Sequence, residues 1–185
     1  MIVIGITGTL GAGKGTIVDY LVKEKGFLHY SAREFLVQEI EKRRLAVNRD
    51  TMTTVANDLR SKHGSGYIAE ELYKQARDSD KNAIVESLRV VGEVHALRKY
   101  ENFYLFAVDA NPEKRYERIS QRKSETDQIS YERFLSDEER ELKSDDPNKQ
   151  NLSRCIELAD YVFNNDGTIE ELQNQVDEVL NKILK

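Results

Sequence analysis

The sequence has little cysteine, no long apolar run and no excess of positive charge, and each shortage excludes something. The one cysteine, Cys155, rules out an internal disulfide and a zinc site built from cysteines. No apolar run approaches the length of a membrane span and no signal peptide is recognisable, so we expect a cytoplasmic protein with no membrane partner. The net charge of −5 argues against broad nucleic-acid binding, which needs a clustered basic face.

Proline is also scarce, and the rest of the composition is that of a globular protein. Two prolines in 185 residues indicate a compact, helix-rich body. Hydrophobic residues at 39% and charged residues at 33% indicate a proper core beneath a highly charged surface. We therefore expect residues 1–185 to form a single domain.

The most informative stretch is a glycine-rich run at residues 8–16. A β-branched run at residues 2–6 precedes it and predicts a buried parallel strand, and helical spacing of apolar residues follows it up to Gly26. Strand, glycine-rich turn and helix are the context of a phosphate-binding loop, in which backbone N–H groups surround an anion and Lys14 reaches the terminal phosphates. We expect this loop to bind ATP through Gly8, Thr9, Leu10, Gly11, Ala12, Gly13, Lys14, Gly15 and Thr16.

The form of this loop resembles that of one kinase superfamily. Gly15 stands where the general pattern has Ser or Thr, and the hydroxyl comes one residue later at Thr16. The pattern G-x-x-G-x-G-K-G-T is similar to that of adenylate kinase and related nucleoside monophosphate kinases, whereas dephospho-coenzyme A kinases usually carry G-K-S or G-K-T. The resemblance implies an α/β fold, the P-loop NTPase three-layer sandwich with a five-stranded parallel sheet. It also implies that Lys14 is catalytic, and that Thr16 lies near a phosphate with Mg²⁺ held largely through water.

Residues 31–80 correspond to the helical insertion that binds the acceptor in such kinases. A second strand is expected at residues 27–30, followed by a helix that starts with a capping box of Ser31 and Glu34. Adenylate kinase has a Thr and an Arg that contact the acceptor here, and this chain has Ala32 and Val37.

Three polar residues of this insertion are candidates for acceptor binding. Ser31 is one of them, and its capping role explains it equally well. Arg33 either replaces the lost charge or is an ordinary first-turn arginine. Two further helices are expected within residues 50–80, and Arg60 on the first of them is a candidate phosphate contact, although a solvated arginine on a helix face is the favoured interpretation.

Residues 83–86 read as a short buried strand that ends in an acid, as a Walker B strand does. Because ligands lie beyond the carboxyl ends of parallel strands, Glu86 is expected to face the loop and to hold magnesium through water. This chain has Glu86-Ser87-Leu88-Arg89 at this point. Nucleoside monophosphate kinases usually have Asp-Gly followed by an aromatic residue, Pro and Arg, whereas small adenylate-kinase-like proteins have Asp-Gly-Ile-Arg. The second pattern aligns without a gap and makes Arg89 the catalytic contact with the acceptor phosphate. Loop capping is the alternative role for both residues.

The resemblance places a short lid at residues 123–148. The helix expected after Pro112 carries Arg115, Arg118 and Arg122 on one face. The resemblance implies that Arg122 and Arg118 touch the phosphates of ATP, whereas a solvated face explains Arg115. A helix is expected from residue 130 to 142, where Arg140 either closes over the transferring phosphoryl group or forms an ion pair.

The last part of the chain resembles dephospho-coenzyme A kinases and the adenylate-kinase-like group. A fifth strand at residues 161–163 leads to an Asn-x-Gly turn, and a second capping box of Thr168 and Glu171 begins the final helix. The resemblance implies that the turn, through Asn165 and Gly167, packs against the adenine ring of ATP.

These features predict an enzyme that moves the γ-phosphoryl group of ATP, with Mg²⁺, to a nucleoside or deoxynucleoside monophosphate. A phosphate acceptor needs no general base, and none stands out. A dephospho-coenzyme A kinase is the alternative, with Glu34 as the acid beside the ribose hydroxyl. An ATP-hydrolysing switch that acts on a protein partner is an alternative of another class, because the acceptor motif is changed and the loop hydroxyl is displaced.

Overall fold

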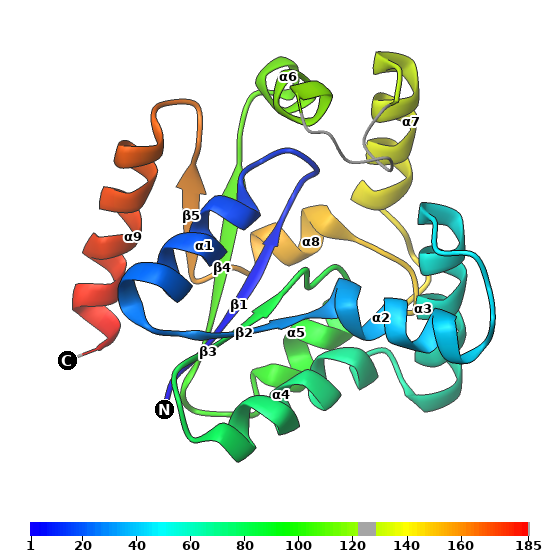
Figure 1. Cartoon of the computed structure of the whole chain (residues 1–185), viewed down its shortest axis with the longest axis horizontal. Helices are drawn as coiled ribbons and strands as arrows, with labels where there is room; N and C mark the ends of the chain where they lie inside the picture. The colour runs from blue at the N-terminus through cyan, green and yellow to red at the C-terminus, as the bar shows by residue number, and fades with distance from the viewer. Residues whose placement is uncertain (122–128, 185) are drawn as a thin grey trace.

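A five-stranded parallel sheet in the order β2-β3-β1-β4-β5 lies at the centre of the molecule (Figure 1). The computed structural model describes residues 1–121 and 129–184. This order brings the second strand to one edge and the last strand to the other, and it confirms the predicted fold class. The strands are β1 (Val3–Gly8), β2 (Leu28–Ser31), β3 (Ala83–Glu86), β4 (Phe103–Asp109) and β5 (Tyr161–Asn164).

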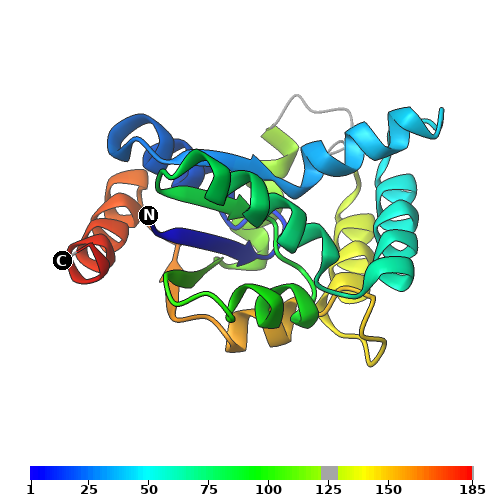
Figure 2. The same cartoon turned by 90° about the horizontal axis from the view of Figure 1, so that it is seen from below.

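The helices form one layer on each face of the sheet and a group beyond the strand ends (Figures 1 and 2). One face is covered by α1 (Lys14–Lys25) and α9 (Ile169–Ile183). The other is covered by α4 (Tyr67–Ser79), α5 (Val91–Leu97) and α8 (Leu152–Glu157). The group beyond the strand ends consists of α2 (Ala32–Lys42), α3 (Arg49–His63), α6 (Pro112–Gln121) and α7 (Tyr131–Leu142).

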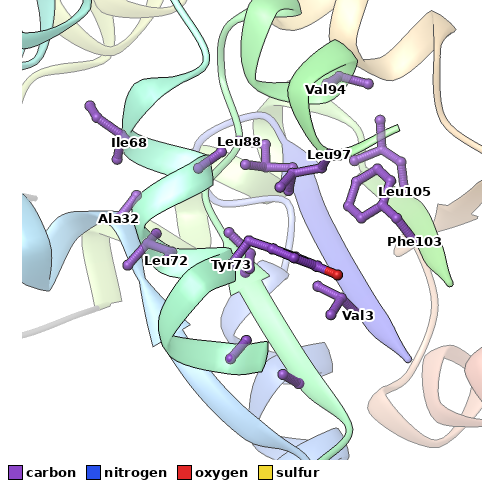
Figure 3. Packing of buried hydrophobic residues seen from close by; sticks show 14 of the residues in the cluster. Val3, Ala32, Ile68, Leu72, Tyr73, Leu88, Val94, Leu97, Phe103 and Leu105 are labelled. Carbon is purple, nitrogen blue, oxygen red and sulfur yellow. The ribbon is translucent and has the colours of Figure 1, made fainter. Parts of the chain in front are cut away.

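Alternate residues of the central strands supply two apolar layers, as the two-residue period of a strand requires. Val3 and Leu105 point to the layer under α4 and α5, where Leu72, Tyr73 and Leu97 pack against them (Figure 3). The intervening residues of the same strands point to the layer under α1 and α9. The buried residues of this second layer include Ile4, Ile84, Phe106, Leu21 and Val176. Burial on both faces explains why the central strands are largely apolar.

Several local predictions are confirmed, and two are corrected. The helix at residues 131–142 is present, and Thr168 and Glu171 form the expected reciprocal cap. Ser31 accepts a hydrogen bond from the Glu34 N–H at 3.3 Å, but the described contacts do not include the return bond from Glu34 that a capping box needs. Leu152–Glu157 forms α8, a helix that was not predicted from the sequence. Six residues are too few to show a helical period, although the Asn151 cap was a readable signal.

Two expectations fall on parts of the chain outside this description. Arg122 and the first residues of the expected lid lie outside the described residues. Among the helices of residues 1–121 and 129–184, none has the length and apolarity that crossing a membrane requires.

Candidate functional site

The loop between β1 and α1 has the backbone of a phosphate-binding turn. Gly11 and Gly13 have φ angles of +79° and +112°, which L-residues with a side chain rarely adopt. A Cβ at Gly11 would lie 2.4 Å from the Arg115 carbonyl oxygen, and one at Gly13 would lie 2.2 Å from Asn165 Nδ2. Lys14 opens α1, and its Nζ donates to the carbonyl oxygens of Gly8 and Thr9, both at 2.8 Å. The loop therefore brings a helix N-terminus and a lysine ammonium together.

Two residues expected to bind ATP support this loop from behind. Asn165 is buried, and its Nδ2 donates to the Ala12 carbonyl oxygen at 2.8 Å. Arg118 Nη2 donates in turn to the Asn165 carbonyl oxygen at 2.7 Å. The buried Nη1 of Arg118 has no hydrogen-bond partner among the residues that the structure describes, and Arg118 does not line the cavity described below. Gly167 is exposed in the turn before α9.

Arg115 is a residue whose role the sequence analysis missed. The expected solvated position is wrong, because Arg115 is only 4% exposed. Its Nε donates to the Ala110 carbonyl oxygen at 2.8 Å and its Nη1 to the Leu10 carbonyl oxygen at 3.3 Å, and it pairs with Glu138 of α7. Arg115 thus ties the phosphate-binding loop to α7. Helical periodicity could not reveal this role, because both partners are distant in the sequence.

A cavity of about 330 Å³ begins at the loop and extends toward α2 and α3. Five loop residues line it, together with polar and apolar residues from α2, α3, the end of β3 and the loop after it, α7 and the chain after α7. The lining consists of Leu10, Gly11, Gly13, Lys14, Gly15, Ala32, Arg33, Leu36, Arg49, Met52, Thr53, Ala56, Arg60, Glu86, Ser87, Arg89, Glu141 and Gln150. One wall is therefore the phosphate-binding loop, and another is the predicted acceptor region.

Arg60 lines this cavity from a buried position, so the interpretation of a solvated helix face is wrong. Its Nε and Nη2 donate to Glu93 Oε1 at 3.1 and 2.8 Å. Glu93 Oε2 accepts from the backbone N–H groups of Arg89 and Val90 at 2.9 and 3.1 Å. A single buried carboxylate thus joins the α3 arginine to the backbone that carries Arg89. Its full set of hydrogen bonds makes its burial tolerable.

Two further arginines of the cavity wall are joined to α7. Arg89 Nη1 donates to Glu141 Oε2 at 2.7 Å and to Gln150 Oε1 at 3.1 Å. Arg49 Nη1 donates to Asp137 Oδ2 at 2.9 Å. Arg49, Glu141 and Gln150 were not among the residues singled out in the sequence, since no motif marks them. They meet because α3 and α7 lie side by side beyond the sheet (Figures 1 and 2).

Glu86 ends β3 at the cavity, where the sequence predicted it, and it is paired with a residue that the prediction omitted. His29 Nε2 and Glu86 Oε2 lie 2.9 Å apart. The hydrogen bond with Glu86 raises the pKa of His29. Burial alone would raise the pKa of Glu86, but the His29 hydrogen bond and the charges of His29, Lys14 and Arg89 outweigh it, so this pKa is lowered. The next residue, Ser87, has a φ of +68°, which explains why glycine is usual at this position in the resembling kinases.

The His29–Glu86 pair predicts a stability that depends on pH. The contribution of His29 to stability is complete below pH 6.5, and it is lost as pH rises through the raised pKa of His29. The contribution of Glu86 to stability is present above pH 4.5, and it is lost as pH falls through the lowered pKa of Glu86. The difference in unfolding free energy between wild type and His29→Gln should therefore be largest between pH 4.5 and 6.5. Urea denaturation across the pH range measures it, and a difference that does not vary with pH would refute the pairing.

Other candidate residues lie outside the cavity lining. Ser31 caps α2 and, with Glu34, Phe35 and Leu72, lines a separate hollow. The Arg140 side chain is 44% exposed. Its Nη1 lies 3.4 Å from Asp50 Oδ1 and its Nη2 lies 3.3 Å from Asp137 Oδ1. This arrangement matches the ion-pair interpretation given for Arg140 from the sequence.

The cavity offers few protein ligands for magnesium. The described part of the chain has no cluster of three or more His, Cys, Asp or Glu side chains suited to a metal. Magnesium bound with a nucleotide needs no such cluster, since phosphates and waters supply most of its ligands. The Glu86 carboxylate at the cavity fits a contact through water, whereas Thr16, half-buried in the first turn of α1, does not line the cavity.

Comparison with protein families gives one match that covers most of the chain. Residues 4–145 match a family model described as an AAA domain. The UPF0200 protein MJ1399 of Methanocaldococcus jannaschii is 32% identical over 187 residues, which cover all of this chain and 91% of that protein. A UPF0200 protein of Staphylothermus marinus is 27% identical and covers all of this chain and 94% of its own length.

Solved structures with the same fold include small kinases. TT1252 from Thermus thermophilus has a TM-score of 0.62 at 19% identity, with 98% of this chain and 97% of that chain covered. A gluconokinase from Sinorhizobium meliloti has a TM-score of 0.61 at 12% identity, with 98% and 93% covered. A shikimate kinase from Bacteroides thetaiotaomicron has a TM-score of 0.57 at 12% identity, with 100% and 99% covered. At these identities the similarity establishes a kinase-like P-loop fold.

Proposed function

The chain belongs to the AAA-domain family and to the UPF0200 protein family, and from its site we propose that it transfers the γ-phosphoryl group of ATP to a nucleoside or deoxynucleoside monophosphate. One observation carries this proposal. The cavity that Lys14 lines is also lined by Arg33, Arg49, Arg60 and Arg89. A loop for one phosphate chain and a set of arginines for a second anion are what transfer between two phosphorylated molecules requires.

In this mechanism the protein positions two anions and neutralises the charge that develops between them. The backbone N–H groups of residues 8–16 and the Lys14 ammonium hold the phosphates of ATP. Arg118 and Asn165, which are hydrogen-bonded to each other behind this loop, would bind ATP as well. Mg²⁺ bound with ATP would supply further positive charge against the phosphates, and Glu86 would hold it through water. Arg49, Arg60 and Arg89, which line the same cavity, would hold the acceptor phosphate in line for attack.

The lining of the acceptor region supports a phosphate as the attacking group. A hydroxyl acceptor needs a base within hydrogen-bond reach. Glu34, the base expected for a dephospho-coenzyme A kinase, lines the separate hollow instead of the cavity. Arginines lie on the acceptor side, together with the apolar Ala32, Leu36 and Met52, which suit the flat face of a base.

A panel of acceptors tests the proposal. ATP consumption with magnesium is measured against ribonucleoside and deoxyribonucleoside monophosphates and against dephospho-coenzyme A. We expect one monophosphate to raise the rate at least about a hundredfold, because positioning of the acceptor is most of the catalysis. Stimulation by dephospho-coenzyme A alone would replace the proposed acceptor with a ribose hydroxyl. A slow rate that no acceptor changes would favour a switch acting on a protein partner.

A further inference from the structure

A carboxylate of the protein occupies the acceptor end of the cavity, between two arginines. Glu141 lines the cavity although its side chain is only 8% exposed. Its Oε2 accepts from Arg89 Nη1 at 2.7 Å, and its Oε1 lies 3.9 Å from Arg49 Nη2. Arg89 belongs to the loop after β3 and Arg49 to the first turn of α3, so two separate elements converge on one carboxylate.

We infer that Glu141 occupies the place of the acceptor's phosphate group, and that a phosphate monoester binds by displacing it from Arg49 and Arg89; this rests on the proposed function. Guanidinium groups bind carboxylate and phosphate with the same fork geometry, so one arrangement serves both anions. A phosphate monoester carries a charge of about −1.5 to −2 at pH 7 and three acceptor oxygens, whereas Glu141 carries one charge and two oxygens. Glu141 therefore selects for a dianion, because a neutral or singly charged group gains too little to displace it.

The two arginines keep their positions without Glu141. Arg89 retains its hydrogen bond to Gln150 Oε1 at 3.1 Å, and its backbone N–H remains bonded to Glu93 at 2.9 Å. Arg49 retains its hydrogen bond to Asp137 Oδ2 at 2.9 Å. Displacement of Glu141 thus frees N–H donors of the two arginines and leaves their other hydrogen bonds intact. Glu141 therefore competes for the anion site and is not needed to hold the arginines in place.

Calorimetric titration with inorganic phosphate tests the inference. The full-length protein carries Lys14→Ala, so that the phosphate-binding loop contributes little heat, and neither ATP nor magnesium is added. Adding Glu141→Gln should tighten phosphate binding about tenfold, the gain expected if Glu141 fills the site about nine-tenths of the time. Glu139→Gln is the matched control, since Glu139 is exposed on the same helix and its replacement removes the same charge. Arg89→Ala should abolish the binding.

The outcomes separate this inference from the proposed function. Glu141→Asp keeps the charge but shortens the side chain, so it should also tighten binding, by less; it serves if the glutamine variant does not fold. Equal or weaker binding in the Glu141 variants than in the Glu139→Gln control would overturn the inference and leave the proposed function standing. Absence of phosphate binding in every variant would contradict both.

Discussion

Replacement of Lys14 by alanine should lower kcat/KM for ATP consumption by about a thousandfold. Removal of one preorganised charge from a phosphoryl-transfer site typically costs two to three orders of magnitude or more. Lys14 lies at the start of α1, with its Nζ over the loop at 2.8 Å from the Gly8 and Thr9 carbonyl oxygens, where the phosphates would lie. Steady-state kinetics with the best acceptor of the panel measure the effect.

Lys23→Ala provides the matched control for this prediction. Lys23 belongs to the same helix, and its side chain is exposed beside Asp19. It should leave kcat/KM unchanged, because an exposed ion pair contributes little. A Lys14→Ala protein that folds normally and keeps more than about a tenth of the activity would contradict the assignment of the loop.

The second large effect is on stability, and it concerns Glu93, the carboxylate that pairs with Arg60 of the cavity lining. Glu93→Ala should lower the free energy of unfolding by about 3–5 kcal/mol, because it leaves the buried Arg60 guanidinium without its partner. It also leaves the N–H groups of Arg89 and Val90 without their acceptor. Urea denaturation measures the loss. Under conditions in which Glu93→Ala is folded, steady-state kinetics should show a raised KM for the acceptor.

Two comparisons identify the cause of that loss. Adding Arg60→Leu to Glu93→Ala should recover part of the stability, since the unpaired buried charge is then gone. Glu157→Ala, which breaks the exposed pair with Arg154, should change the stability little. A loss in Glu93→Ala no larger than that in Glu157→Ala would contradict the role assigned to Glu93.

The phosphate-binding loop could be predicted because its signal is local. Strand, glycine turn and helix follow one another within residues 2–26, and the required backbone conformation is visible as Gly11 and Gly13. Glu86 was predictable for a related reason, because the carboxyl ends of parallel strands meet at one edge of the sheet.

The part of the cavity lined by Arg49, Arg60, Arg89 and Glu141 could not be predicted in full, because these residues meet only through tertiary packing. Arg49 and Glu141 are separated by about half of the chain, and Arg60 looks like a surface residue until Glu93 is placed beside it. Arg115 was misjudged for the same reason, since its partners are the Leu10 carbonyl group and Glu138. A charge on a helix face does not reveal from the sequence whether water or a carboxylate lies opposite it.

The fate of the γ-phosphoryl group tests the central claim most directly. The protein is incubated with γ-labelled ATP, magnesium and the acceptor that stimulates it most, and the products are separated. The proposed function predicts that the label appears in a nucleoside diphosphate formed from the acceptor. Label that appears only as inorganic phosphate, at a rate that is the same without acceptor, would contradict it.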